Sequence, residues 1–201
     1  MPAATGFVVA GGRSARMGLD KALLPWGDGT LLDHALRRLQ AVCGEARILS
    51  GPEPRYVDRG VPVITDIVKN AGPLAGIHAG LLHLDAPAGL FLAVDVPLVP
   101  SVVLAALLRA SDGHDAAVPV VNGQPEPLCA VYRQSCREAV ARRLEGGERK
   151  MTSFWPDVRV RTLDEAELAA FGDPAGMFRN LNTLEEYRRL RPRGRRLRPL
   201  S

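Results

Sequence analysis

A glycine loop with three basic residues follows an apolar segment near the start of the chain. The apolar run ends at Gly11 and Gly12, and Arg13, Arg16 and Lys21 follow soon after. Glycines allow positive φ angles and a close approach of backbone N–H groups to an anion, and the three side chains add positive charge. The loop therefore predicts a polyphosphate site in which these cations stabilise phosphate oxygens.

Two common phosphate-loop patterns do not fit this segment. A Walker A loop needs a second glycine five positions after the first, followed by Lys and then Ser or Thr. Counted from Gly11, the second glycine and the Lys would stand at positions 16 and 17, which are Arg and Met. The spacing of Gly11, Gly12 and Gly18 also differs from the dinucleotide fingerprint G-x-G-x-x-G. An ordinary glycine-rich turn with solvated cations remains the alternative for this segment taken alone.

Length and composition favour one globular domain. The chain has 201 residues, of which 46% are hydrophobic and 24% charged, and no apolar run is long enough for a membrane span. Its amino terminus lacks the cationic segment of a signal peptide. We therefore expect no membrane partner.

Cysteine and histidine usage excludes two further classes. The 3 cysteines, an odd number without C-x-x-C spacing, argue against a disulfide framework and favour a reducing, cytoplasmic setting. The 4 histidines are scattered, without the spacing of a zinc site.

The basic charge of the chain is concentrated at its carboxyl end. Seven arginines lie after Tyr187, and without them the net charge of +4 would become negative. No aromatic residue interleaves with these arginines, so the stacking platform of a single-strand binder is missing. We expect a domain over residues 1–190 and a basic, disordered tail over residues 191–201, with no nucleic-acid partner.

Short apolar runs alternate with helical patterns along the domain. This alternation predicts an α/β fold with a mostly parallel, doubly wound sheet and helices on both faces. The expected strands are residues 6–9, 46–49, 61–64, 90–94, 116–121 and 128–132, and the expected helices are residues 31–42, with Thr30 as cap, 75–84, 101–110 and 135–144.

Polar residues cluster where these strands end, which is where open α/β sheets bind ligands. The first strand ends in the glycine loop, and about twenty residues separate it from its helix, far more than the usual two to six. The second and third strands end near Ser50 and Asp66. A second glycine loop, Gly72 to Gly76, then opens a helix whose N-terminus favours anions.

Asp95 directly follows the fourth strand, and Pro97 ends the strand pairing behind it. A carboxylate there points into the crevice where a triphosphate would lie, so Asp95 is the expected Mg²⁺ ligand. Alternatively, Asp95 closes a turn or caps the helix that begins near Ser101.

Five ordered motifs resemble the molybdenum cofactor guanylyltransferases, cytoplasmic nucleotidyltransferases with a Rossmann-like fold. They span about residues 6 to 190. The motifs are A-G-G-R-S-x-R-M-G-x-D-K at Ala10 to Lys21, G-P-L-A-G at Gly72 to Gly76, D-x-P at Asp95 to Pro97, P-L-C-A-V-Y at Pro127 to Tyr132, and F-x-N-x-N-T at Phe178 to Thr183. Ser50 stands where relatives often carry Asn, and Leu184 where they usually carry Pro.

The resemblance implies transfer of GMP from MgGTP to molybdopterin with release of pyrophosphate. It also implies transient contacts with molybdopterin-supplying proteins and molybdoenzymes. The implied nucleotide contacts are Val9, Ala10, Gly11, Gly12, Lys21, Ser50, Asp66 and Asp95, with Asp95 also on the metal and Asn180 and Asn182 near the acceptor. Residues 122–126, Arg149 and Lys150 are further expected contacts of the pterin, with a solvated charged loop as the alternative.

Other functions remain open at this stage. A cytidylyltransferase for the same cofactor or a sugar-phosphate nucleotidyltransferase would use the same loops. A nucleotide-binding adaptor that delivers the cofactor, with the arginine tail as a docking arm, is the alternative outside enzymes.

Overall fold

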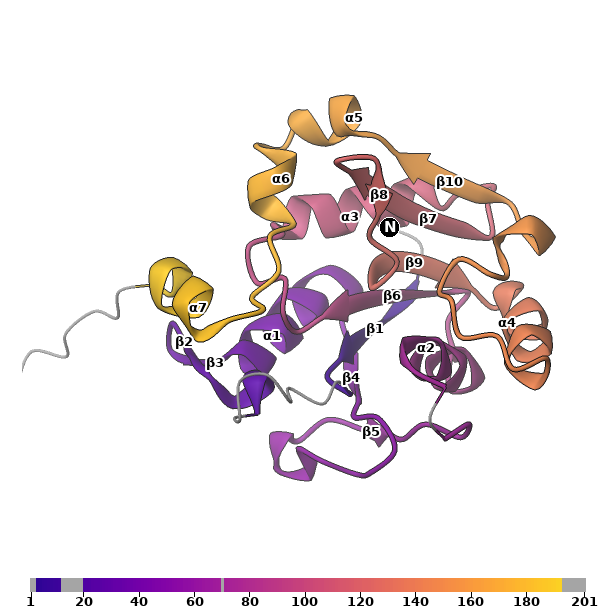
Figure 1. Cartoon of the computed structure of the whole chain (residues 1–201), viewed down its shortest axis with the longest axis horizontal. Helices are drawn as coiled ribbons and strands as arrows, with labels where there is room; N and C mark the ends of the chain where they lie inside the picture. The colour runs from indigo at the N-terminus through magenta and orange to yellow at the C-terminus, as the bar shows by residue number, and fades with distance from the viewer. Residues whose placement is uncertain (1–2, 12–19, 70, 193–201) are drawn as a thin grey trace, which may run out of the picture.

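The structure, a computed structural model, describes residues 3–11, 20–69 and 71–192. A single main sheet runs through the molecule with helices on both faces (Figure 1). Its strand order is β10-β7-β9-β6-β1-β4-β5, with β8 paired to β7. The α/β fold expected from the sequence is confirmed.

The half of the sheet that is built from the first half of the sequence is parallel. In its centre, β1 (Ala4–Val9) lies between β4 (Ala46–Leu49) and β6 (Ala88–Ala93), and β5 (Val63–Ile64) extends it at one edge. All residues of β6 are buried, because helices cover both faces. The carboxyl ends of these strands therefore meet at one edge of the sheet, as the functional prediction requires.

The other half of the sheet is mixed. Here β9 (Cys129–Arg133) runs antiparallel to both β6 and β7 (Ala116–Val121), whereas β10 (Val160–Leu163) is parallel to β7. The chain reverses after β7 in a tight hairpin to β8 (Gln124–Pro125), with positive φ at Asn122 and Gly123. This hairpin is the physical reason that the sheet is only mostly parallel.

Among the described residues, two long helices pack on each face of the sheet. Figure 1 shows α1 (Leu31–Cys43) and α3 (Ser101–Ala110) on one face and α2 (Pro73–Leu82) and α4 (Cys136–Glu145) on the other. Each pair encloses its own apolar cluster against the strands. The predicted cap is confirmed, because Thr30 and Asp33 form a reciprocal capping box at the start of α1.

Smaller elements complete the chain. Between β1 and α1 lie the 3₁₀ turn η1 (Lys21–Leu23) and a hairpin, β2 (Pro25–Trp26) and β3 (Gly29–Thr30). Further turns and short helices are η2 (Val57–Arg59), η3 (Trp155–Asp157), α5 (Glu165–Ala169), α6 (Pro174–Met177) and α7 (Leu184–Leu190).

The last described helix, α7, packs against the β2–β3 hairpin (Figure 1). There the Tyr187 hydroxyl donates to the Pro25 carbonyl at 2.6 Å. Most of the predicted tail, residues 193–201, lies outside the described residues. Across residues 3–11, 20–69 and 71–192, no helix has the length and apolar character needed to cross a membrane.

Candidate active site

A pocket of about 690 Å³ lies where β1, β4 and β6 end. This volume lies within the range of small-molecule sites. Six of the eight expected nucleotide contacts line it, namely Val9, Ala10, Gly11, Lys21, Asp66 and Asp95. Gly12, Arg13 and Arg16, which were also expected there, lie outside the described residues.

Lys21 and Asp95 come together in this pocket from segments far apart in the sequence. Lys21 Nζ lies 3.2 Å from Asp95 Oδ2, and both side chains are largely buried. Asp95 does not cap α3, because the cap position is Pro100 and it makes no side-chain hydrogen bond. The capping alternative is therefore wrong, whereas Asp95 does lie in a turn and also lines the pocket.

The ends of β1 and β4 approach each other so closely that both contact positions are glycine. A Cβ atom on Gly11 would lie 2.8 Å from the backbone nitrogen and Cα of Gly51. Gly51 itself has φ +82°, a backbone conformation that residues with a side chain rarely adopt. Backbone rather than side chains thus forms this wall of the pocket, which leaves room for a ligand to approach.

Asp66 and the second glycine loop form another wall. Gly72 has φ 68°, and Pro73 begins α2, so the N-terminus of this helix lies at the pocket. The Asp66 carboxyl lies near Gly76 in the first turns of α2, and burial raises its pKa. This wall combines an anion-favouring helix end with a hydrogen-bond acceptor.

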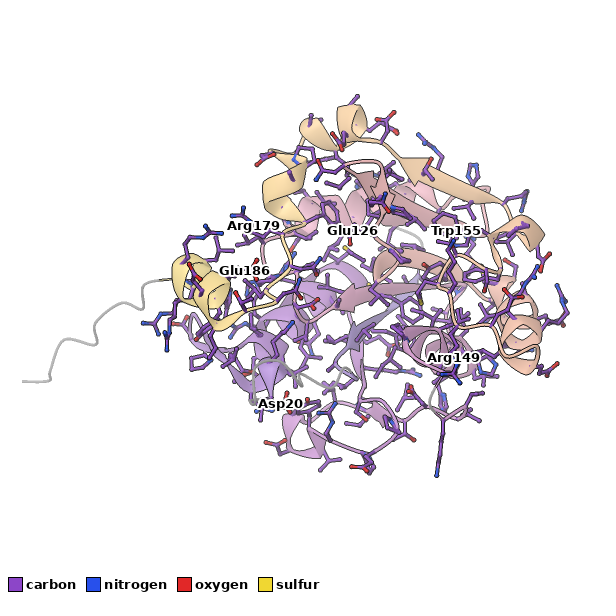
Figure 2. All side chains as sticks on the ribbon, in the orientation of Figure 1. Asp20, Glu126, Arg149, Trp155, Arg179 and Glu186 are labelled. Carbon is purple, nitrogen blue, oxygen red and sulfur yellow. The ribbon has the colours of Figure 1, made fainter. Side chains whose placement is uncertain are left out.

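A second carboxyl group lies near Asp95. Glu126, labelled in Figure 2, follows β8, and its pKa is raised by burial first and by the charge of Asp95 second. Among the described residues, no three His, Cys, Asp or Glu side chains are grouped to hold a metal ion. Oxygen donors of this kind, one or two in number, match Mg²⁺, which completes its shell with water and phosphate oxygens.

Comparisons with known proteins agree with this geometry. The family of MobA-like NTP transferase domains matches residues 6–161. The chain belongs to this family. It is a nucleotidyltransferase, and the resemblance found in its motifs is confirmed.

Relatives of this nucleotidyltransferase carry specific names. A probable molybdenum cofactor guanylyltransferase of Pelotomaculum thermopropionicum is 36% identical over 90% of this chain and 88% of that protein. A molybdenum cofactor guanylyltransferase of Desulfosudis oleivorans is 32% identical over 92% of this chain and 93% of its own length. The crystal structure of molybdopterin-guanine dinucleotide biosynthesis protein A from Archaeoglobus fulgidus is 26% identical and superposes with a TM-score of 0.79, covering 92% and 95% of the two chains.

Not every expected site residue of the nucleotidyltransferase reaches the pocket. Ser50 is fully buried, and its hydroxyl donates to the Glu53 carbonyl at 2.7 Å, so the hydroxyl is engaged behind the pocket wall. Asn180 and Asn182 do not line the pocket either. They flank Leu181, however, whose backbone N–H donates to the Asp95 carbonyl at 2.9 Å.

Arg149, which was expected to contact the pterin, lines the pocket. It lies beyond α4 in the sequence, and Figure 2 shows it near α2, on the other side of β4 from Asp20. In the region 122–126, Asn122 is exposed and its backbone N–H donates to Glu165. Only the Glu126 end of that region lies near Asp95.

Three residues at the site were missed by sequence reasoning. Asp20 lines the pocket, and Arg55 and Tyr56 bond to its carboxylate. Asp20 is part of the first motif, so its place next to Lys21 was a usable signal. Arg55 and Tyr56 lie in an irregular loop after β4, where no periodicity points to a contact.

Proposed function

We propose that this nucleotidyltransferase transfers GMP from MgGTP to molybdopterin and releases pyrophosphate. The observation that carries the proposal is the Lys21–Asp95 pair inside a pocket at the carboxyl ends of β1, β4 and β6. A cation and a carboxylate at this place suit a metal-bound triphosphate. The names of the relatives support a product that joins a molybdopterin to a guanine nucleotide.

Asp95 is the proposed Mg²⁺ ligand. Its side chain is 28% exposed and lines the pocket, so one carboxylate oxygen can face a metal while Lys21 contacts the other. Bound Mg²⁺ would withdraw charge from phosphate oxygens. Glu126 is a second oxygen donor of this region, and burial and then the charge of Asp95 raise its pKa.

The remaining contribution of the chain is alignment and charge. A terminal phosphate oxygen of molybdopterin would attack the α-phosphorus of GTP, forming a new P–O bond while the bond to the β-phosphate breaks. Lys21, with Arg13 and Arg16 from the first motif, would stabilise the charge that builds on the departing pyrophosphate. The attacking phosphate, with a second pKa of about 6, is already largely ionised at neutral pH and needs no general base.

The cysteines are poorly suited to act as nucleophiles. Burial raises the pKa of Cys43, Cys129 and Cys136 to about 12 in each case. Thiols with such pKa values carry almost no thiolate at neutral pH. Their state supports direct transfer between substrates without a covalent intermediate on a thiol.

Guanine and the acceptor are assigned to different residues of the site. Guanine carries N–H donors at N1 and N2, so we assign it to the Asp66 carboxylate, with Val9, Ala10 and Gly11 against the nucleoside. We place the pterin near Asn180, Asn182 and Arg149. Within a cytoplasmic setting, the enzyme would meet proteins that supply molybdopterin and enzymes that receive the product, and neither a membrane nor nucleic acid.

The test measures pyrophosphate release with Mg²⁺ and molybdopterin, using GTP, CTP and ATP in parallel. We expect release with GTP alone. Asp95→Asn and Lys21→Ala should each lower the rate by at least about a hundredfold without changing the melting temperature by more than a few degrees. Release with CTP would overturn the base assignment, and full activity of Asp95→Asn would overturn the metal role.

A further inference from the structure

The guanidinium of Arg55 joins three segments that meet at the pocket. Its Nη2 donates to the backbone carbonyls of Ala10 at 2.9 Å and Ser50 at 3.2 Å, and its Nη1 lies 3.4 Å from Asp20 Oδ2. Ala10 directly follows β1, and Asp20 precedes Lys21. One side chain thus ties both ends of the segment that contains the first motif's arginines.

Tyr56 completes the hold on Asp20. Its hydroxyl lies 2.7 and 2.9 Å from the two carboxylate oxygens, and burial together with the hydrogen bond to Asp20 raises its pKa, so it remains a donor. The residue has φ 66°, an uncommon conformation for a bulky side chain. A residue keeps this backbone conformation only where surrounding contacts support it. One such contact is the Arg55 guanidinium, which lies 5.1 Å from the centre of the Tyr56 ring.

Asp20, fixed by these contacts, in turn fixes the backbone turn that begins with Lys21. Its carboxylate caps the turn η1 by accepting the Ala22 backbone N–H at 3.1 Å. Lys21 is the first residue of that turn, and its ammonium group reaches Asp95. A displaced Asp20 would change the direction in which the Lys21 side chain points.

We infer that Arg55 and Tyr56 are positioning residues that act through Asp20 to hold Lys21 at the phosphate end of the pocket. This inference rests on the proposed function, because it takes Lys21 as a phosphate contact. The expected signature is a change in nucleotide affinity and turnover that a general loss of stability would not produce.

A neighbouring ion pair offers a matched control. Arg59 ends η2, four positions after Arg55, and its Nη1 is 2.8 Å from Asp33 Oδ1 at the start of α1. Neither Arg59 nor Asp33 lines the pocket. Arg59→Met therefore removes a similar guanidinium–carboxylate contact without touching Asp20.

The experiment measures the Kd for MgGTP by calorimetry, the steady-state KM and kcat, and the melting temperature of each variant. Arg55→Met should raise the Kd and KM for GTP about tenfold, as expected for losing charge-assisted hydrogen bonds, and Arg55→Lys should restore part of the loss. Tyr56→Phe should move the same constants in the same direction. Arg59→Met should lower only the melting temperature and leave the Kd within about twofold.

A double-mutant cycle tests the route through Asp20. If Arg55 acts through Asp20, adding Arg55→Met to Asp20→Asn should raise the Kd far less than it does in the wild type. Fully additive effects, or an Arg55→Met variant that behaves like Arg59→Met, would overturn the inference while leaving the proposed function intact. A wild-type enzyme that binds no MgGTP would instead overturn the proposed function, and the inference with it.

Discussion

Asp66 is the residue whose ionisation we expect to control nucleotide binding. Burial raises the pKa of its carboxyl, and only the carboxylate accepts hydrogen bonds from both N–H groups of guanine. GTP affinity should therefore fall as the pH drops through this raised pKa, above the ordinary value of 3.8. Calorimetric Kd values for MgGTP between about pH 4 and pH 7 would show this fall.

The same residue affects stability in the opposite sense. The folded protein holds the Asp66 proton more tightly than the unfolded chain, so this group's contribution to the free energy of unfolding decreases as the pH rises through the raised pKa.

Asp66→Asn tests the binding prediction. It should remove the pH dependence of GTP binding and weaken GTP binding at neutral pH about tenfold or more. Asp28→Asn, at an exposed turn position, is the control. An unchanged pH profile in Asp66→Asn would assign the dependence to another group.

Residues that directly follow strands could be predicted, whereas residues in irregular loops could not. Asp95 follows an apolar run, and the rule that ligands bind at the carboxyl ends of strands was enough to place it. Arg55 reaches Asp20 across 35 positions of sequence from a loop without periodicity. A charged loop residue is usually solvated, so only the structure distinguishes this contact from the common case.

At the scale of elements, the approach of β1 to β4 depends on Gly11. In Gly11→Ala, the new methyl group would lie 2.8 Å from backbone atoms of Gly51, which cannot rotate away. The two strand ends must separate, which should cost about 1–3 kcal/mol of stability and weaken GTP binding, because both glycines line the pocket. Denaturant unfolding and the Kd for MgGTP measure the two effects.

A matched glycine makes the result specific. At Gly146, which follows α4, a Cβ atom would make only ordinary contacts, 3.5 Å from the nearest atoms. Gly146→Ala should leave both stability and affinity within experimental error or raise stability slightly. If Gly11→Ala behaves like Gly146→Ala, the two loops can separate without cost and the close approach has no functional weight.

Hydrophobic patterns predicted the long elements better than their directions. The strands at residues 46–49 and 116–121 and the helix at residues 101–110 have the predicted bounds. Strand β10 was missed because most of it is only half-buried, and its place beside β7 depends on contacts such as Arg159 with Asp115, 44 positions away. The antiparallel direction of β9 likewise follows from a two-residue turn rather than from periodicity.

At the scale of the whole molecule, the carboxyl-terminal segment supports both members of the Lys21–Asp95 pair. A small apolar cluster joins Leu24 and Trp26, just after Lys21, to Leu181 and Tyr187. Leu181 in turn bonds to the Asp95 carbonyl through its backbone N–H. The turn that carries Lys21 and the strand end that carries Asp95 therefore share one supporting cluster, built from both ends of the chain.

Tyr187 is the residue that tests this connection. It is 6% exposed, its ring centre lies 6.4 Å from that of Trp26, and its hydroxyl donates to Pro25. Tyr187→Ala should lower the free energy of unfolding by about 3–5 kcal/mol, as for other buried aromatic residues. Tyr187→Phe keeps the ring and loses only the hydrogen bond, so it should cost about 1 kcal/mol.

The two variants should also differ in activity under conditions where both are folded. Loss of the ring frees the hairpin that follows Lys21 and the segment that holds Asp95, so kcat/KM for GTP should fall in Tyr187→Ala and stay near the wild-type value in Tyr187→Phe. Pyrophosphate release well below both melting temperatures separates this effect from unfolding. Equal kcat/KM values for Tyr187→Ala and the wild type would show that Lys21 and Asp95 are positioned by their own strands and turns alone, because the shared cluster would then stabilise the fold without orienting the site.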